Sequence, residues 1–377
     1  MRGAGLSMPS GRSSGVDKGM LAGLVTLGLV GIAVIYSATR QLLLNAGYNP
    51  HYYLERQVVW VTLGVIVMAV VSRIDYRRFE ILTTALYIGS ILALLGVFVL
   101  GSSQLGATRW YVFGPIQIQP SEFALLAVIL AMSTYCGRRP EGLTRYDISR
   151  MLVMAGVPLA LIIVQPDLGT AIVMLLVVGA IFVIAGVPPR FMALLGVLGS
   201  IGAVGAVYFG ILHRYQILRL VSFLHQNSSN VQLQRLIYEV SNAKTAIGAG
   251  GVFGAGAFKG LQTTGGYVPE QRTDFIFTAI GEQFGLIGTI TIVLLLSFVG
   301  YRIYAVARDA KEPMGRLMCV GIFVFFAFSC FENIGMTLGI MPVTGIPLPL
   351  LSYGGSSALV FFLCGGVVLS VSRRRTN

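Results

Sequence analysis

Acidic side chains in or beside long apolar runs are the residues of this chain whose type and position suit chemistry. They are Glu122, Asp167, Asp274, Glu282 and Glu332. A charge inside a membrane-spanning segment costs at least about 2.5 kcal/mol on insertion scales and is usually functional. Glu122, Asp167 and Asp274 each begin an apolar run, where a carboxylate can also cap free helix amides. Two interpretations therefore stay open for these three, capping alone and a shared polar pocket.

Glu282 and Glu332 lie deeper in their apolar runs, too far from the ends to act as caps. One explanation is pairing with a buried hydroxyl or amide, such as that of Asn333. The other is a place in a polar path through the membrane. The sequence does not choose between them.

A lone carboxylate beside basic groups suits one reaction well, the attack of a hydroxyl on a carbon that carries a diphosphate leaving group. The reaction needs a general base for the hydroxyl proton and cations for the departing charge. Asp274 is the candidate base. The candidate cations are Arg109, Arg214, Arg219, Lys244 and Arg272. The alternative for each cation is a solvated or headgroup-facing charge.

The elements that position these residues are membrane-spanning helices. Of the 377 residues, 55% are hydrophobic and 11% charged, against about 25% charged in a soluble domain. The apolar runs have the length that a helix needs to cross a bilayer core of about 30 Å. Ten spans are predicted, at residues 19–39, 57–72, 81–101, 122–136, 150–164, 168–187, 191–212, 275–301, 317–340 and 351–371. The fold class is therefore an all-α polytopic membrane protein.

Three parts are predicted: a polar tail of residues 1–18, a single membrane domain of residues 19–372, and a basic tail of residues 373–377. With both termini in the cytoplasm, the inner segments hold 18 of the 27 basic residues. Six of the other nine lie in one long segment, residues 213–274, which is predicted to be a large extracytoplasmic loop. The prediction is a multi-pass protein of the bacterial cytoplasmic membrane.

The predicted loop contains two amphipathic stretches, residues 215–224 and 231–247, whose pattern favours helices on the outer membrane surface. A glycine-rich stretch, residues 248–266, follows them and leads to Asp274. We expect no regular helix in that stretch, because glycine is a poor helix former.

Several other signals are weak. The net charge of +12 is explained by the loops that flank the spans, so no nucleic acid partner is predicted. Cys136, Cys319, Cys330 and Cys364 lie in or at the ends of apolar runs without metal-ligand spacing, and are interpreted as small core residues. The glycine-rich stretch does not fit GxGxxG, because Phe253 occupies the position that needs glycine.

Five ordered boxes resemble those of the SEDS family (shape, elongation, division and sporulation). They are Gly106-Ala107-Thr108-Arg109-Trp110 with Gln119-Pro120-Ser121-Glu122; Gln165-Pro166-Asp167-Leu168-Gly169-Thr170; Val268-Pro269-Glu270-Gln271-Arg272-Thr273-Asp274-Phe275-Ile276-Phe277; Gly281-Glu282-Gln283-Phe284-Gly285; and Met341-Pro342-Val343-Thr344-Gly345-Ile346-Pro347-Leu348-Pro349 with Leu351-Ser352-Tyr353-Gly354-Gly355-Ser356-Ser357. The match runs from about residue 36 to residue 372. Arg56-Gln57 and Ile74-Asp75-Tyr76-Arg77 resemble the RodA branch more than the FtsW branch.

The resemblance implies a peptidoglycan glycosyltransferase that polymerises lipid II on the outer face of the membrane, for cell elongation and rod shape. Asp274 matches the family's essential aspartate, the base for the 4-hydroxyl of incoming lipid II. A divalent cation, Mg²⁺ or Mn²⁺, and a class B penicillin-binding protein as partner are also implied. The residues assigned to substrate binding are Arg109, Glu122, Asp167, Lys244, Glu270, Arg272 and Ser356.

One position departs from the family pattern. The box that ends at Glu122 usually continues to a lysine three residues later, where this chain has Leu125. The usual pairing is therefore absent or taken over by another cation, such as Arg109. A lysine restored at position 125 is expected to be tolerated if Glu122 faces the pocket.

Two other functions stay open. A transporter that flips lipid II or another anionic lipid would use Glu282 and Glu332 in a moving polar path. A scaffold that only anchors a partner enzyme would use the carboxylates as helix caps. Polymerisation of lipid II by the purified protein, and its loss in Asp274→Asn, would separate the enzyme from both alternatives.

Overall fold

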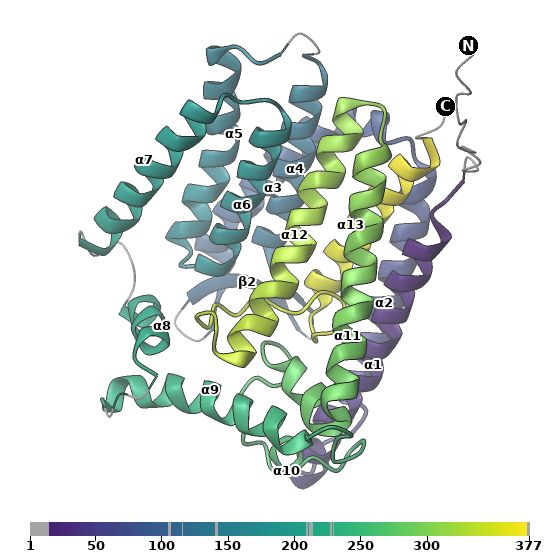
Figure 1. Cartoon of the computed structure of the whole chain (residues 1–377), viewed down its shortest axis with the longest axis vertical. Coiled ribbons are helices and arrows are strands. Elements are labelled where there is room, and N and C mark those ends of the chain that lie inside the picture. Colours follow the sequence, from purple (N-terminus) through teal and green to yellow (C-terminus); the bar gives the residue numbers. More distant parts are fainter. Residues whose placement is uncertain are drawn as a thin grey trace, which may run out of the picture.

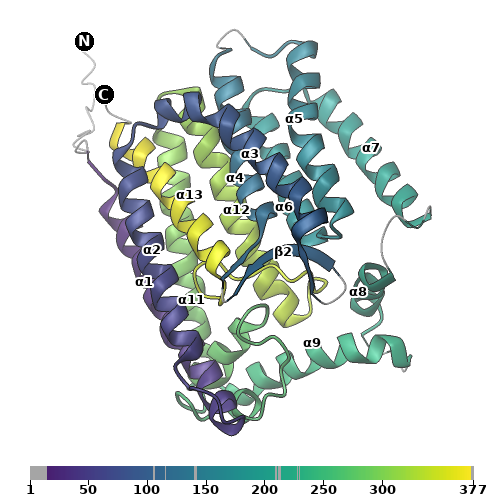
Figure 2. The same cartoon turned by 180° about the vertical axis from the view of Figure 1, so that it is seen from behind.

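The computed structural model describes residues 15–104, 107–114, 116–139, 142–208, 210, 214–226, 228 and 230–374. Within them, long helices form one bundle, with shorter helices and a small sheet gathered toward one end (Figures 1 and 2). The long helices are α1 (Lys18–Asn45), α2 (Tyr52–Arg73), α3 (Phe79–Leu100), α4 (Pro120–Gly137), α5 (Arg145–Val164), α6 (Leu168–Ile184), α7 (Pro189–Tyr208), α11 (Ile276–Asp309), α12 (Pro313–Leu338) and α13 (Gly355–Arg374).

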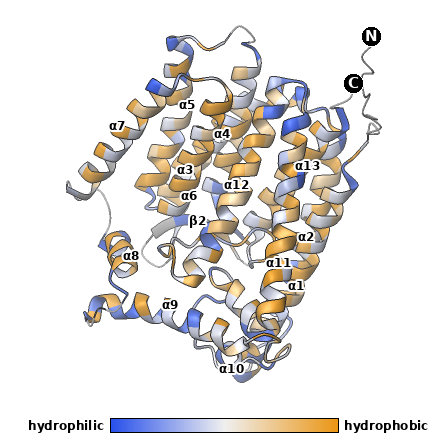
Figure 3. Cartoon of the chain, in the orientation of Figure 1, coloured by the Kyte–Doolittle hydropathy of each residue, from blue (hydrophilic) through white to orange (hydrophobic). Residues whose placement is uncertain are grey.

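These helices correspond in order to the ten predicted spans. Nine of those in the described ranges have the length and hydropathy of a membrane crossing, whereas α6 is shorter, with 17 residues. Figure 3 shows hydrophobic residues along the flanks of the bundle and hydrophilic residues gathered near its ends. The prediction of an all-α, multi-pass membrane protein is confirmed, and the count of ten crossings stays a prediction.

Some predicted boundaries were wrong. Helix α13 begins later than predicted and continues through Arg374, into the predicted basic tail. Helix α11 continues to Asp309 and contains one non-helical residue, Gly285, with φ +64°. The predicted tails fall largely on residues 1–14 and 375–377, which lie outside the described residues.

A short antiparallel sheet between α3 and α4 was not predicted. Its strands are β1 (Ser102–Gln104), β2 (Ala107–Phe113) and β3 (Ile116–Ile118), in the order β1-β2-β3. Strand β2 contains Trp110, Tyr111 and Val112, aromatic and β-branched residues that favour extended backbone. The hydroxyl of Tyr111 donates to the carbonyl of Ala93 at 2.8 Å, which ties the sheet to α3.

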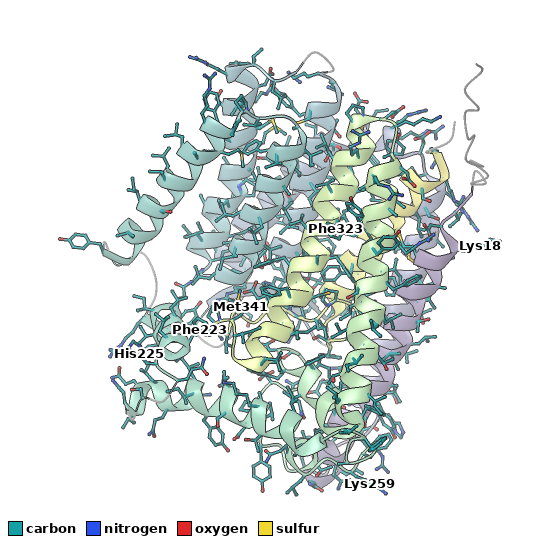
Figure 4. The ribbon with its side chains drawn as sticks, viewed as in Figure 1. Lys18, Phe223, His225, Lys259, Phe323 and Met341 are labelled. Carbon is teal, nitrogen blue, oxygen red and sulfur yellow. The ribbon has the colours of Figure 1, made fainter. Side chains whose placement is uncertain are left out.

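The segment 213–274 contains α8 (Arg214–Leu224), α9 (Val231–Gly250) and the short α10 (Leu261–Thr264). The two predicted stretches are helical, and their place on the outer membrane surface stays a prediction. The expectation for residues 248–266 was only partly correct, since α9 continues through Gly250 before the backbone becomes irregular. Lys259, in that irregular part, lies at the lower end of the molecule in the view of Figure 4, well below Lys18.

Helices α4 and α13 are the most buried of the long helices, and both run through the middle of the bundle. Leu125 of α4 is fully buried in the main hydrophobic core. Helix α7 stands apart from the other long helices in both views and packs chiefly against α6 (Figures 1 and 2). The core therefore holds α4, α12 and α13 firmly, and these helices carry several of the polar residues described next.

Candidate active-site pocket

A cavity of about 470 Å³ opens between the sheet, α8 and the ends of several long helices. Its charged lining residues are Arg56, Arg109, Glu122, Asp167, Arg219, Glu270, Arg272 and Asp274. They come from α2, β2, α4, α6, α8 and the loop before α11. The fold thus gathers four cations and four carboxylates from distant parts of the chain into one pocket.

Asp274 is held in place by its backbone. Its amide donates to the carbonyl of Glu270 at 3.0 Å, and its own carbonyl accepts from Nδ2 of Asn333 at 2.8 Å. The residue at the start of α11 is Phe275, and no side chain caps that helix. The carboxylate of Asp274 is therefore not a helix cap and points instead to the pocket that it lines.

The surroundings of Asp274 suit a general base. Desolvation raises the pKa of its carboxyl to about 6, and Glu270 acts in the same direction. Arg219, the strongest opposing influence, lowers it, together with Thr273 and Arg109. A carboxylate with a pKa near 6 is ionised at neutral pH yet binds a proton more strongly than an ordinary aspartate.

Gly345 allows Asp274 and Arg219 to face each other. It has φ +83°, and a Cβ atom at this position would lie 3.3 Å from Oδ2 of Asp274 and 3.9 Å from Nη1 of Arg219. Any other residue would combine an unfavourable backbone conformation with crowding of the carboxylate. The glycine of the last family box thus makes room for the candidate base.

Glu270 shapes the loop that carries Asp274. Its φ of +46° is unusual for a residue other than glycine. Its carbonyl accepts from the amides of Thr273, Asp274 and Phe275. Its carboxylate lies 3.4 Å from Nη2 of Arg272. The loop is therefore a tight turn closed by backbone hydrogen bonds.

Arg272 faces the aromatic side of the pocket. Its guanidinium lies 5.0 Å from the ring centroid of Tyr53, and its carbonyl accepts from the amide of Tyr353 at 2.8 Å. The rings of Tyr53 and Tyr353 meet edge to face at 4.9 Å. Arg272 is thus a partly exposed cation on an aromatic wall.

Asp167 stabilises the start of α6 and the loop around it. It is the N-cap of α6, and Oδ2 accepts from Gln119 at 2.8 Å, Ser121 at 3.0 Å and Thr170 at 2.9 Å. The side chain is almost fully buried. Asp167 therefore caps α6 and also lines the pocket, so the two interpretations do not exclude each other for this residue.

Arg109 links the sheet to α6 and α8. Nη1 lies 3.8 Å from Oδ1 of Asp167, and Nη2 donates to the hydroxyl of Tyr215 at 2.5 Å and to the carbonyl of Pro166. The hydroxyl of Tyr215 donates to the same carbonyl at 2.7 Å. Most donors of Arg109 are already occupied, so it supports the pocket wall more than it offers a free cation.

Glu122 and Ser356 meet at the buried end of the pocket. Glu122 lies in the first turn of α4, is 8% exposed, and its Oε2 has no partner in the described part of the chain. The hydroxyl of Ser356 interacts with Glu122 and accepts from the amide of Gln119 at 3.2 Å. Arg109 does not take the place of the family lysine at position 125, because its guanidinium lies beside Asp167, and no salt bridge to Glu122 occurs among the described residues.

Lys244 is the one predicted substrate-binding residue that does not line the pocket. It lies on α9, exposed, and Nζ donates to Oε1 of Gln226 at 2.7 Å. The structure therefore brings together Arg109, Glu122, Asp167, Glu270, Arg272, Asp274 and Ser356, and leaves Lys244 outside. Arg214, another candidate cation, is exposed on α8 and donates to Gln232.

Glu282 turned out to act as a cap after all. It is 1% exposed and accepts from the amides of Gln262 at 2.6 Å and Thr263 at 2.8 Å, and from the hydroxyl of Thr263 at 2.6 Å. These donors begin α10, whose own N-cap residue, Gly260, has no side chain to do so. The sequence could not reveal this, because the partners lie about twenty residues earlier in the chain.

Glu332 is buried in α12 beside Thr344, and its Oε2 has no partner in the described ranges. The neighbouring Asn333 does not pair with it. Instead, Nδ2 of Asn333 donates to the carbonyls of Asp274 and Ile346, both at 2.8 Å. Asn333 thus positions the loop of the candidate base.

The comparison with family models decides the family. The model described as cell cycle protein, FTSW_RODA_SPOVE, matches residues 18–377. The chain belongs to this FtsW, RodA and SpoVE family. The SEDS resemblance of the boxes is thereby confirmed, although Gly106 of the first box lies outside the described residues.

Curated relatives match over nearly the full length. The chain is 33% identical over 362 residues to the peptidoglycan glycosyltransferase MrdB of Escherichia coli K12, which covers 96% of this chain and 94% of MrdB. It is 32% identical over 357 residues to the probable peptidoglycan glycosyltransferase FtsW of Geobacter metallireducens, covering 93% and 92%.

Solved structures of the family have the same fold. The crystal structure of the rod shape determining protein RodA of Thermus thermophilus gives a TM-score of 0.70 at 28% identity, covering 96% of this chain and 98% of RodA. A chain from a structure of a peptidoglycan synthase complex, which concerns coordination of polymerization and crosslinking, gives 0.78 at 29% identity, covering 96% and 98%.

Sequence reasoning missed several pocket residues of this family member. Arg56, Tyr53 and Trp60 enter from the first turns of α2, and Trp110 enters from β2. Tyr53, Arg56 and Trp60 follow one another at steps of three and four, which would have indicated a common helix face. Nothing in the local sequence indicated that this face meets Asp274.

Proposed function

We propose that this chain is a peptidoglycan glycosyltransferase that polymerises lipid II. The observation that carries the proposal is the partly exposed carboxylate of Asp274 in a cavity of about 470 Å³ lined by four arginines. The membership of a family whose curated relatives are named peptidoglycan glycosyltransferases supports it.

Asp274 would act as the general base. Its carboxylate takes the proton of the 4-hydroxyl of the incoming lipid II sugar while that oxygen attacks the anomeric carbon of the growing chain. A new C–O bond forms, the bond from the anomeric carbon to the diphosphate breaks, and undecaprenyl diphosphate leaves with the bonding electrons. The raised pKa of Asp274, about 6, suits both holding and releasing the proton.

The arginines would stabilise the diphosphate that leaves. Arg272 and Arg56 lie on the aromatic side of the pocket, where Arg56 packs over the ring of Tyr52 at 3.6 Å from its centroid. Guanidinium groups bind phosphate oxygens through paired hydrogen bonds. Trp60 and Trp110 offer flat apolar surfaces for sugar rings. Lys244 stays a predicted substrate contact that would require movement of α9.

The family resemblance implies a divalent cation, and the residues that the structure describes form no site of their own for it. In the described part of the chain, no three His, Cys, Asp or Glu side chains form a group fit to hold a metal ion. A Mg²⁺ ion is commonly bound by one or two carboxylates together with substrate phosphates. We propose that the cation arrives with the diphosphate rather than at a preformed site.

We further propose that the pocket faces the outside of the cytoplasmic membrane, with both termini inside and residues 213–274 on the outer surface. The distribution of basic residues supports this orientation. A class B penicillin-binding protein is the proposed partner, in line with the related peptidoglycan synthase complex. The RodA-like residues Arg56-Gln57 and 74–77 favour cell elongation, although MrdB and FtsW relatives are about equally similar.

A transporter is less well supported, because Glu282, one of the two acidic residues expected in its polar path, has a structural role instead. Glu282 accepts three hydrogen bonds from the start of α10 and does not line the pocket. A carboxylate in that state is a structural acceptor and offers no exchangeable site along a path. Glu332, the other acidic residue of that path, has an Oε2 without a partner in the described ranges, but it does not line the pocket either.

The test is lipid II polymerisation by purified protein, with its partner present. Asp274→Asn is expected to abolish polymer while it keeps the elution volume and Tm of the wild type. Asp309→Asn is the matched control, since Asp309 ends α11 beside Arg308 and does not line the pocket. Normal polymer from Asp274→Asn would refute the proposal, as would equal loss in the control.

A further inference from the structure

A second cavity, of about 480 Å³, lies at the far end of α2 from the active-site pocket. Its lining residues are Val70, Arg73, Ile74, Asp75, Arg78 and Arg374. None of them lines the pocket of Asp274. Arg56 and Arg73 are separated by 17 residues of α2, so the cavities lie about 25 Å apart along that helix.

Arg374 lies at the edge of this second cavity, where several contacts hold its side chain in place. Its Nε lies 3.2 Å from Oδ2 of Asp75, Nη1 donates to the carbonyl of Ser370 at 3.1 Å, and Nη2 donates to the carbonyl of Arg73 at 3.1 Å. The other oxygen of Asp75 accepts the amide of Arg77 at 3.0 Å. The carboxylate is therefore already occupied, and it fastens the end of α13 to the end of α2.

The other two arginines of the cavity are available to a ligand. Arg73 and Arg78 are exposed, and their side chains form no hydrogen bond or ion pair within the described ranges. Arg77, between them, is paired with Glu312 and does not line the cavity. Three guanidinium groups and one carboxylate give the cavity a net charge of +2, which favours an anion with phosphate geometry.

An apolar stripe on α2 leads directly to this charged cavity. Its members are exposed and recur at steps of four, three and four residues: Val59, Leu63, Ile66 and Val70. Such spacing puts side chains on one helix face. Arg73 follows Val70 by three residues and continues the same face. The opposite face of α2, including Gly64, packs against Phe362 of α13.

We propose that this cavity binds the phosphate headgroup of an anionic phospholipid, and that one acyl chain of this lipid lies along the apolar stripe of α2. The charge selects a phosphate, and the stripe selects a lipid over a free anion, because only a lipid fills both. Basic pockets between membrane helices commonly bind such headgroups. In the orientation proposed above, the lipid belongs to the cytoplasmic leaflet.

The test is native mass spectrometry of the purified full-length chain in detergent, with no lipid II present. Titration with phosphatidylglycerol is expected to give one tightly held lipid. Arg73→Gln/Arg78→Gln is expected to weaken that binding at least tenfold, and Arg73→Lys/Arg78→Lys to weaken it less, because the charge remains. Phosphatidylcholine is expected to bind as weakly to the wild type as phosphatidylglycerol does to the double glutamine variant.

Arg145→Gln/Arg190→Gln is the matched control. These arginines are exposed and begin α5 and α7, at the same end of the bundle as Arg73, but do not line the cavity. The proposal predicts wild-type lipid binding for this control. Equal loss in both pairs would overturn it, as would competition by millimolar inorganic phosphate or equal binding of phosphatidylcholine. Since no polymerisation is measured, these outcomes are independent of the proposed glycosyltransferase activity.

Discussion

Two carboxylates eight residues apart, Asp274 and Glu282, lie in very different surroundings. Glu282 is buried and accepts three hydrogen bonds from the start of α10. Asp274 is partly exposed in the pocket, and desolvation is the dominant influence on its pKa, only partly offset by Arg219 and Thr273. Helix α11 begins between them. The loop side thus carries the proposed general base and the helix side a structural acceptor.

The difference shows that the function of an acidic group near a membrane depends on its donors more than on its depth. A buried carboxylate that accepts several hydrogen bonds from the backbone and side chains of another element serves as a structural acceptor. A carboxylate that lacks them keeps a raised proton affinity. Glu282 lies deeper in its apolar run than Asp274, yet it is the one whose role is structural.

The largest expected effect on stability comes from Glu282→Gln. The amide cannot accept all three hydrogen bonds and brings an N–H group against backbone donors, so buried donors lose their partner. We expect Tm to fall on the order of 5 °C or more. Glu55→Gln, at an exposed site in the first turn of α2, is the control and should leave Tm unchanged. An unchanged Tm in Glu282→Gln would remove the contrast.

The rate of polymerisation is expected to depend on pH through the ionisation of Asp274. The carboxyl of Asp274, with its pKa raised to about 6, must be ionised to accept a proton. The rate is therefore expected to be level above about pH 7 and to fall about tenfold per pH unit below 6. Because folding raises this pKa, ionisation of Asp274 makes the fold less stable as pH rises from about 4 to 6. A fall in the rate centred near pH 4 instead would contradict the assignment of Asp274 as the general base.

Arg219→Gln is a second test of Asp274 as the general base. Arg219 lowers the pKa of Asp274, so its loss is expected to move the acidic limb to higher pH and to slow polymerisation on the order of tenfold. Arg214→Gln, five residues earlier on the same helix and outside the pocket, should leave both quantities unchanged. A slower rate without movement of the limb would mean that Arg219 only supports the fold.

The smallest effect is expected for Leu125→Lys. Leu125 is fully buried one turn after Glu122, whose Oε2 lacks a partner in the described residues. The new ammonium can pair with that oxygen, so folded yield should be close to wild type. An unpaired buried charge costs about 3–5 kcal/mol, so the same change in a Glu122→Gln background should abolish folded protein by size-exclusion chromatography. Equal yields in both backgrounds would exclude the pairing.

Much of the bundle could be predicted from sequence, because long apolar runs have few stable forms in a membrane. Helices α8 and α9 could be predicted for a different reason, because their apolar residues alternate with charged ones in an amphipathic helical pattern. The sheet could not, since β2 is short and lies between two spans. The end of α13 was missed because Arg374 is held by Asp75 and by backbone carbonyls, contacts that local sequence does not reveal.

The site was predictable where a motif carried it and not where tertiary packing did. The family boxes indicated Asp274, Arg272 and Ser356, which the fold brings into one pocket. Arg56 enters that pocket only because α2 packs along α13, more than 290 residues later in the chain. Lys244 seemed a suitable cation by charge and position in the loop, but the course of α9 turns it to Gln226.

The most direct test of the central claim separates binding from chemistry in Asp274→Asn. Lipid II affinity and the single-turnover rate of glycan formation at saturating lipid II would be measured on the same purified protein. We expect affinity within about threefold of wild type and a rate at least about a thousandfold lower, since only the proton acceptor is lost. A wild-type rate, or a rate loss fully explained by lost binding, would contradict it.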